Sequence, residues 1–168
     1  MTDATASATP AATDNQPVYS IEKIYVKDLS LEVPNAPQIF LEREAPQVDV
    51  QLHHVSSKVD EGVFQTELTL TITAKIGEKT MFLVEANQAG IFAIRNVPES
   101  DLDPILGISN PNILYPYVRE TVSDAIVRAG FPPVLLNPVN FEALYQAQKQ
   151  HDAQQPAATP AAAQLVTH

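Results

Sequence analysis

The segment from residue 63 to residue 76, VFQTELTLTITAKI, alternates between core-forming and polar side chains. One parity carries Phe64, Leu68, Leu70, Ile72 and Ile76, and the other is mostly Thr, Glu and Lys. Because successive side chains of a strand point to opposite faces, the pattern predicts a long strand with one buried and one wetted face. A sheet with a solvated side is typical of antiparallel pairing. The pattern therefore predicts a sheet with one side covered by the rest of the chain and the other side in contact with water.

Three further strands are predicted, near residues 19–32, 48–53 and 80–88. Gly77 and Glu78 suit a two-residue type II′ turn between the last two strands. The proline-rich stretch VPNAPQIFLEREAP, residues 33–46, predicts a crossover after the first strand rather than a hairpin. In the first strand one parity holds Tyr19, Ile21, Tyr25, Leu29 and Leu31, and the other holds Glu22, Ile24, Val26, Asp28 and Glu32.

Two helices are predicted after the strands. The first has Asn110 as its N-cap, Pro111 at its first position and Gly130 at its end. The second follows Asn140, another cap residue. Strands first and helices last predict an α+β fold: a four-stranded antiparallel sheet with a crossover after strand 1 and two C-terminal helices packed on one face.

Both ends of the chain have low-complexity composition, rich in Ala, Thr, Gln and Pro. We expect disordered tails at residues 1–17 and 150–168, which leaves one folded domain at residues 18–149. The first residues lack the basic and apolar regions of a secretory signal, and no apolar run reaches the length of a membrane span. These features predict a soluble, cytoplasmic protein without membrane insertion.

The residues favour a binding protein over an enzyme. The formal net charge of −10 disfavours nucleic acid; it serves either solubility alone or attraction of basic partners. The chain has no cysteine, and its five glycines form no phosphate-binding loop. His53 and His54 are neighbours on a strand and point to opposite faces, and Glu99, Asp101 and Asp103 lack the spacing of a calcium loop. We expect no catalytic site, no metal and no cofactor.

Two surfaces stand out by position. Strand parity allows a common water-facing side for an acidic set with one leucine: Asp28, Glu32, Leu83 and Glu85. This set is either an ordinary polar face or a docking patch for a basic partner. Aromatic residues outside the strands are either core or the lining of a groove for extended apolar peptide; they are Phe40, Phe131, Phe141 and Tyr145. The surplus of apolar surface over what two helices cover predicts an oligomer.

Four strings then carry a resemblance: YVKDLSLEVPNAPQIF, GIFAI, NPNILYPYVRE and FPPVLLNPVNFEALY. In this order and spacing they closely resemble the SecB family of export chaperones, over about residues 19–145. The resemblance implies a homotetramer, a dimer of dimers with its long helices between two sheets. It also implies that the chain holds unfolded secretory preproteins in the bacterial cytoplasm and passes them to the motor ATPase SecA, with no enzymatic activity or cofactor of its own.

The resemblance further implies roles for individual residues. It assigns SecA binding to Asp28, Glu32, Leu83 and Glu85. It links Phe82, Val84, Ala86 and Gln88 to the tetramer interface, although family members often have Cys where Val84 stands. It places Phe40, Phe82 and Tyr145 in a client groove, although a tryptophan common in the family is missing from LEREAP. The competing hypotheses are an acidic adaptor without holdase activity and a small hydrolase or isomerase with a site in the groove.

Overall fold

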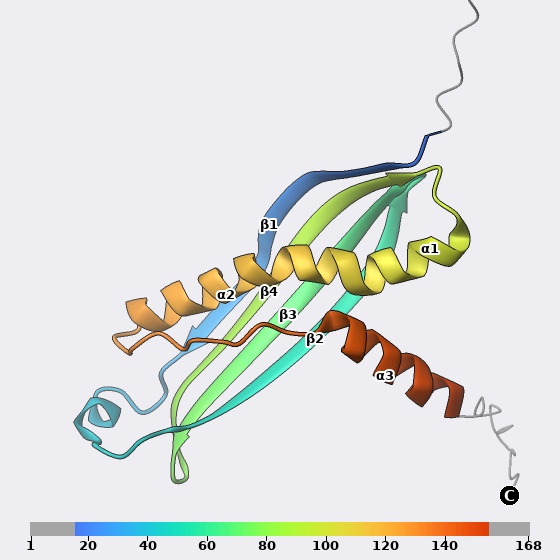
Figure 1. Cartoon of the computed structure of the whole chain (residues 1–168). Helices are drawn as coiled ribbons and strands as arrows, with labels where there is room; N and C mark the ends of the chain where they lie inside the picture. Colours follow the sequence, from blue (N-terminus) through green and yellow to red (C-terminus); the bar gives the residue numbers. More distant parts are fainter. Residues whose placement is uncertain (1–15, 155–168) are drawn as a thin grey trace, which may run out of the picture.

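The computed structural model describes residues 16–154. In it a four-stranded sheet carries helices over one of its faces (Figure 1). All neighbouring strands are antiparallel, in the order β1-β4-β3-β2. The predicted fold class is confirmed. Most of both predicted tails, residues 1–15 and 155–168, lies outside the described residues. The strands are β1 (Val18–Glu32), β2 (Gln47–Asp60), β3 (Val63–Ile76) and β4 (Lys79–Arg95).

The connections follow from local chemistry. Gly77 has φ +56° in the two-residue turn between β3 and β4, and Ile76 pairs with Lys79 across it, as a type II′ turn requires. Because β1 and β2 are opposite edges of the sheet, the crossover runs past the ends of the two central strands. It contains a short 3₁₀ helix, Gln38–Leu41, in which Ile39 is buried.

The two faces of the sheet differ as the β3 pattern predicts. The apolar residues of β3 are buried against the helices, and Thr and Glu alternate with them on the opposite side. We call the helix-covered side the inner face and the bare side the outer face. Gly90 of β4 permits the close helix contact, because a Cβ there would lie 3.0 Å from Cδ2 of Leu114 and 2.7 Å from the Phe92 ring.

β1 does not keep a single alternation. Its pairing with β4 has register shifts between Ile21 and Lys23 and between Val26 and Asp28. Each such bulge adds one residue and reverses which side chains point inward. The predicted grouping of Tyr25 with Leu29 is therefore wrong. Ile24 and Leu31 pack against the core, whereas Tyr25 reaches Gln65 on the outer face; Tyr19, Ile21, Ile24, Val26, Leu29 and Leu31 face inward.

The long helical segment begins earlier than predicted. α1 (Glu99–Pro104), a π-helical turn (Ile105–Ser109) and α2 (Asn110–Arg128) follow without interruption. Asn110 has helical φ and ψ angles and lies inside the helix, so its assignment as an N-cap is wrong. In the π turn the Asn110 amide donates to the carbonyl of Ile105, five residues back. The carbonyl of Leu106 would need a donor from Pro111, which has no N–H. Ser56 Oγ donates to the Leu106 carbonyl instead, at 3.3 Å.

The acidic stretch before Asn110 is likewise helical. Glu99, Asp101 and Asp103, which lack the spacing of a calcium loop, belong to α1. Pro116 is exposed together with Asn112, so water can satisfy the carbonyl that this proline leaves without a donor.

The end of α2 sets the path of the last segment. Gly130 has φ +90°, and the amides of Gly130 and Phe131 donate to the carbonyls of Val127 and Ile126, which is a Schellman cap. Residues 131–140 then run back along α2, where the Tyr115 hydroxyl donates to the carbonyl of Asn137 at 2.6 Å.

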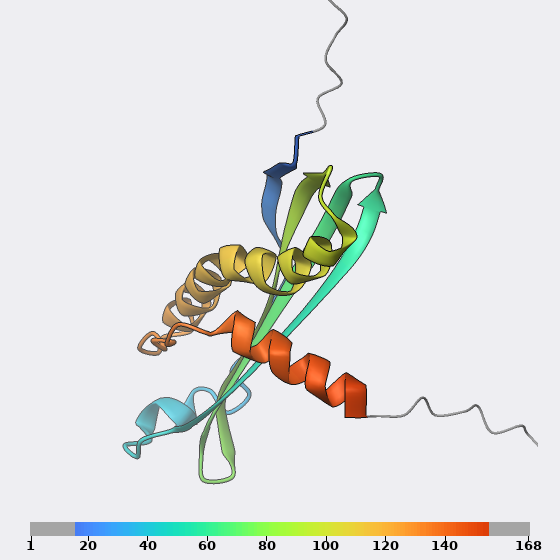
Figure 2. The ribbon, with the colours of Figure 1, turned by 45° about the vertical axis from the view of Figure 1, so that its right-hand side comes forward.

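The last helix, α3 (Phe141–Gln154), has the predicted cap, because the Ala143 amide donates to Asn140 Oδ1 at 2.9 Å. It continues to Gln154, past the expected domain boundary at 149. Figures 1 and 2 show α2 and α3 on the same side of the sheet.

Candidate functional site

The predicted acidic set lies together on the outer face. Glu32 of β1 pairs directly with Leu83 of β4, and Ser30 pairs with Glu85. Asp28 is opposite Asn87, two residues beyond Ser30 and Glu85 and so on the same face. At about 3.3 Å per residue, Asp28 and Glu32 are roughly 13 Å apart, with Glu85 beside the middle of that span. We call Asp28, Glu32, Leu83 and Glu85 the acidic docking face.

The carboxylates of this face are available for a cation. Asp28 and Glu32 are exposed, and Leu83 and Glu85 are partly exposed. Among residues 16–154, the ion pairs of the structure use other carboxylates: those of Glu67, Glu42, Asp124 and Asp103. Glu85 accepts one hydrogen bond, from Thr71 Oγ1 at 2.7 Å. A face with unpaired carboxylates around one leucine suits a basic segment that also carries an apolar side chain.

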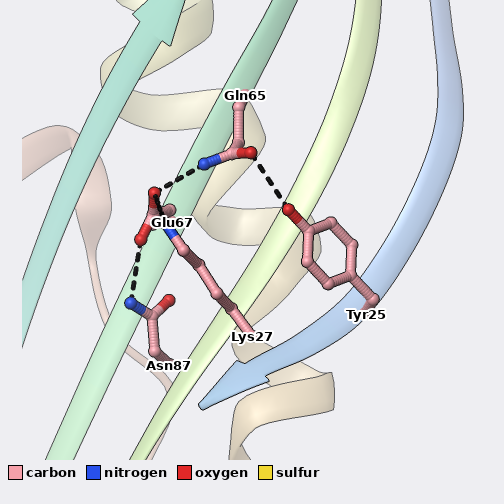
Figure 3. Close-up of polar contacts among 5 residues, drawn as sticks. All are labelled: Tyr25, Lys27, Gln65, Glu67 and Asn87. Carbon is pink, nitrogen blue, oxygen red and sulfur yellow. Dashed lines mark hydrogen bonds and ion pairs between the residues drawn. The ribbon is translucent and has the colours of Figure 1, made fainter.

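A second group of polar side chains lies beside this face, on β1, β3 and β4 (Figure 3). Glu67 accepts hydrogen bonds from Lys27 Nζ at 2.6 Å, Gln65 Nε2 at 2.5 Å and Asn87 Nδ2 at 2.8 Å. The Tyr25 hydroxyl donates to Gln65 Oε1 at 3.0 Å. The hydrogen bond from Lys27, with those from Asn87 and Gln65, lowers the pKa of Glu67. We call these five residues the Glu67 cluster.

The residues that the resemblance links to the tetramer lie on the inner face. Phe82, Val84, Ala86 and Gln88 are at most 4% exposed, beneath α2. Gln88 Oε1 accepts a hydrogen bond from Thr121 of α2 at 3.3 Å. Side chains buried this deeply do not present a surface to another chain, so any effect on assembly passes through the placement of α2.

An aromatic stack joins the crossover to the sheet. The Phe131 ring lies 5.0 Å from the Phe40 ring and 5.2 Å from the Phe82 ring, centroid to centroid. Phe40 is 45% exposed, whereas Phe82 and Phe131 are buried. The Schellman cap of α2 places Phe131 between the two rings that the resemblance names. Its position right after the helix-ending Gly130 is the sequence signal for this contact.

Tyr145 lies apart from these three rings, against α1 and the π turn. Its hydroxyl donates to Asp103 Oδ2 at 2.7 Å, and Lys149 forms an ion pair with the same carboxylate. Its ring packs on Gly107 of the π turn, where a Cβ would lie 2.6 Å from the ring. The hydrogen bonds from Lys149 and Tyr145 lower the pKa of Asp103. The structure therefore brings Phe40 and Phe82 together through Phe131, while Tyr145 lines a separate cavity of about 340 Å³ beside His54.

A buried polar network on the inner face was not predicted. The Tyr19 hydroxyl donates to Asn110 Oδ1 at 2.7 Å, Asn110 Nδ2 donates to Thr66 Oγ1 at 2.9 Å, and Thr66 shares a 2.8 Å hydrogen bond with Ser56. Asn110 and Thr66 are fully buried. The available signal is Thr66, a polar residue at a core position of β3.

Metal-binding and membrane-spanning features are missing from the part of the chain that the structure describes. His53 and His54 lie on opposite faces of β2, and burial lowers the pKa of His54. Within residues 16–154, no three His, Asp or Glu side chains form a group that could hold a metal. No helix in that range has the length and hydropathy to cross a membrane.

Comparisons with known proteins identify the family of the chain. The family described as "Preprotein translocase subunit SecB" matches residues 12–152. The chain is 60% identical over 149 residues to the protein-export protein SecB of Methylobacillus flagellatus, covering 89% of this chain and 95% of the relative. It is 67% identical over 135 residues to that of Aromatoleum aromaticum, covering 80% and 85%.

A solved structure shows the same fold. The SecB-like chaperone of Mycobacterium tuberculosis, in complex with a ChAD peptide from the HigA1 antitoxin, superposes with a TM-score of 0.61 at 18% identity. The match covers 72% of this chain and 90% of that one. The resemblance seen in the sequence is confirmed, and the chain belongs to the SecB family of protein-export chaperones.

Proposed function

We propose that this chain is an ATP-independent holdase that binds unfolded secretory preproteins in the cytoplasm and delivers them to SecA. The observation that carries the proposal is the separation of two unlike surfaces. Unpaired carboxylates lie on the bare face of the sheet, whereas the crossover, the helices and the segment between α2 and α3 carry exposed apolar side chains. Family membership supports a preprotein-binding export chaperone.

Exposed apolar residues supply the client surface. Phe40 and Leu41 of the crossover are 45% and 75% exposed, and Leu135 of the segment after α2 is 88% exposed. Such side chains bind extended apolar chain without reading its sequence. Each contact is weak, and several copies in one assembly would supply avidity.

A homotetramer, as a dimer of dimers, would supply these copies. Apolar side chains on the inner face of β1 and on the solvent side of α2 are about half exposed in the single chain, among them Ile21, Tyr117 and Val127. Association of chains would bury them.

The acidic docking face supplies the SecA contact. Asp28, Glu32 and Glu85 attract a basic segment, and Leu83 offers an apolar contact among them. Because this face carries no helix, a partner reaches it without displacing a client held on the helix side.

The test reverses one charge on the acidic docking face and, separately, one charge in the β2–β3 turn. Glu85→Lys should weaken SecA binding about tenfold or more, because a like charge then faces the basic partner. Glu61→Lys, the same change in the β2–β3 turn, is the matched control and should bind SecA as the wild type does. SecA affinity is measured by calorimetry and client binding by suppression of aggregation of a slowly folding preprotein. An equal loss of both activities in Glu85→Lys would show that the two surfaces are not separate.

An acidic adaptor without holdase activity is the alternative function. An adaptor would leave aggregation of the unfolded preprotein unchanged. Native mass spectrometry with and without that preprotein then tests assembly and client binding together. A tetramer that gains one client chain supports the proposal, and a monomer that gains none contradicts it.

A further inference from the structure

The second bulge of β1 places two oppositely charged neighbours on one face. The register shift between Val26 and Asp28 puts Asp28 opposite Asn87, whose side chain lies on the outer face. Lys27 also reaches the outer face, where it contacts Glu67. In a regular strand consecutive side chains point to opposite sides, so only the bulge makes Lys27 a neighbour of Asp28 on this surface. A lysine so placed is a natural partner for the carboxylate beside it.

Glu67 takes this lysine instead. Lys27 Nζ lies 2.6 Å from Glu67 Oε1, on β3, so the lysine side chain extends across β4 (Figure 3). The Lys27 side chain remains 46% exposed, whereas that of Glu67 is 15% exposed. Asp28 takes part in none of the ion pairs of the described residues.

The acceptor is held in place by its other partners. Gln65 and Asn87 each donate to Glu67, and Tyr25 fixes Gln65 in turn. Asn87 commits its Nδ2 to this bond although its Oδ1 is buried without a hydrogen-bond partner. A carboxylate already oriented by two donors loses little further freedom when the ammonium binds, which favours Glu67 over a mobile surface carboxylate.

We propose that Glu67 is a positioning residue for the acidic docking face: it holds the Lys27 ammonium over β3 and so leaves the Asp28 carboxylate unpaired for a cation of the docking partner. The inference rests on the proposed function, in which Asp28 contacts SecA. Without the Glu67 charge, the flexible side chain of Lys27 turns to Asp28, the adjacent carboxylate on the same face. A partner cation must then displace Lys27 before it binds.

The experiment removes each charge alone and both together, and SecA affinity is measured at low and high salt. We expect Glu67→Gln to weaken SecA binding by about two- to fivefold, the range of a single competing surface ion pair, and less at high salt. Lys27→Met should not weaken binding, because the competitor is gone. The double variant Lys27→Met/Glu67→Gln should return to nearly wild-type affinity.

A matched control accounts for net charge. Glu42 forms a 2.6 Å ion pair with Lys79 near the crossover. Glu42→Gln changes the total charge of the protein as Glu67→Gln does, and it should leave SecA affinity unchanged. A loss equal to that of Glu67→Gln would mean that net charge alone sets affinity, which overturns the inference.

The role of Asp28 is tested in an Asp28→Asn background. If Glu67 acts through Asp28, Glu67→Gln should cause no further loss of affinity once Asp28 is neutral. The same loss in both backgrounds would show that Glu67 acts directly on the partner, and the positioning role would be refuted.

A measurement without SecA separates this inference from the proposed function. In protein labelled with ¹³C-lysine, NMR should show the Lys27 ε-protons close to Glu67 in the wild type and close to Asp28 in Glu67→Gln. Failure of the wild type to bind SecA would contradict the proposed docking role. The NMR contacts of Lys27 would still decide whether Glu67 holds the lysine away from Asp28. Lys27 remaining away from Asp28 in Glu67→Gln would overturn the inference.

Discussion

Two tyrosines of β1 reach β3 on opposite faces of the same sheet. On the inner face Tyr19 contacts Asn110, which contacts Thr66. On the outer face Tyr25 contacts Gln65, which contacts Glu67. The first network is neutral and is centred on Asn110 and Thr66, which are buried beneath a helix, whereas the second ends in an ion pair at the surface. The comparison separates polar contacts that hold the fold from polar contacts that arrange charge for binding.

The difference follows from the surroundings of each network. A buried polar group that loses its partner cannot turn to water, so its loss costs the free energy of folding. A charged group at the surface keeps its hydration when its partner is removed, and solvent screens the pair. We therefore expect inner-face substitutions to change the free energy of unfolding. Outer-face substitutions should mainly change which charged side chains pair with each other.

The largest expected effect on stability comes from Asn110→Leu. Leucine has similar volume but removes the acceptor of the Tyr19 hydroxyl and the donor to the buried Thr66 Oγ1, and we expect a loss of about 2 kcal/mol in the free energy of unfolding. Urea unfolding at one fixed protein concentration measures it, because assembly makes stability depend on concentration. Asn112→Leu is the control on the exposed side of the same helix and should change stability by at most about 0.5 kcal/mol. Equal losses would contradict a special role for the buried network.

A smaller effect is expected from Thr66→Val. This change keeps the shape of the side chain and removes one hydroxyl, which leaves Asn110 Nδ2 without its acceptor. We expect a loss of about 1 kcal/mol. Thr69 lies three residues further along β3, on the outer face. Thr69→Val is the control and should leave the free energy of unfolding nearly unchanged.

The double variant Asn110→Leu/Thr66→Val tests whether the two residues form one unit. It should lose less stability than the sum of the two single losses, because both single changes break the same hydrogen bond between Asn110 and Thr66. Strict additivity in the double-mutant cycle would show that the two residues act independently.

Much of the fold could be predicted because its signals are local. The alternation of β3, the turn at Gly77, the helix end at Gly130 and the cap at Asn140 each depend on a few consecutive residues. The bulges of β1 could not be predicted, because β4 determines where an extra residue is inserted. Asn110 was predicted as a cap because Pro111 follows it, but in the structure the helix continues through a π turn and the Asn110 side chain donates to Thr66 instead of capping.

The candidate site divides in the same way. The shared face of Asp28, Glu32, Leu83 and Glu85 was predicted correctly from parity, since no bulge falls between residues 28 and 32 or within the facing part of β4. The ion pair between Glu67 and Lys27 was not predicted, because the two residues lie two strands apart in the sheet. Tyr145 was grouped with Phe40 because both are aromatic residues outside the strands, but Tyr145 packs on Gly107, away from Phe40.

The smallest expected effect on stability is the contribution of the Glu67 charge. It depends on pH, whereas the contribution of the inner network does not. The pKa of Glu67 is lowered from its ordinary value of 4.5, chiefly by the hydrogen bond from Lys27. A carboxyl group whose pKa is lower in the folded state binds fewer protons there than in the unfolded state between the two pKa values. Its contribution to stability is therefore complete above the ordinary value and is lost as the pH falls through the folded-state pKa.

The melting temperatures of wild type and Glu67→Gln, compared from pH 7 down to pH 3, measure this contribution. The wild type should melt slightly higher at neutral pH, and the gap should close as the pH falls below about 4.5, the ordinary glutamate range. Because the inner network has no group that titrates in this range, the gap between wild type and Asn110→Leu should persist across it. A gap for Glu67→Gln that stays constant with pH would mean that the Glu67 cluster stabilises the sheet through shape rather than charge, and the contrast between the two faces would fail.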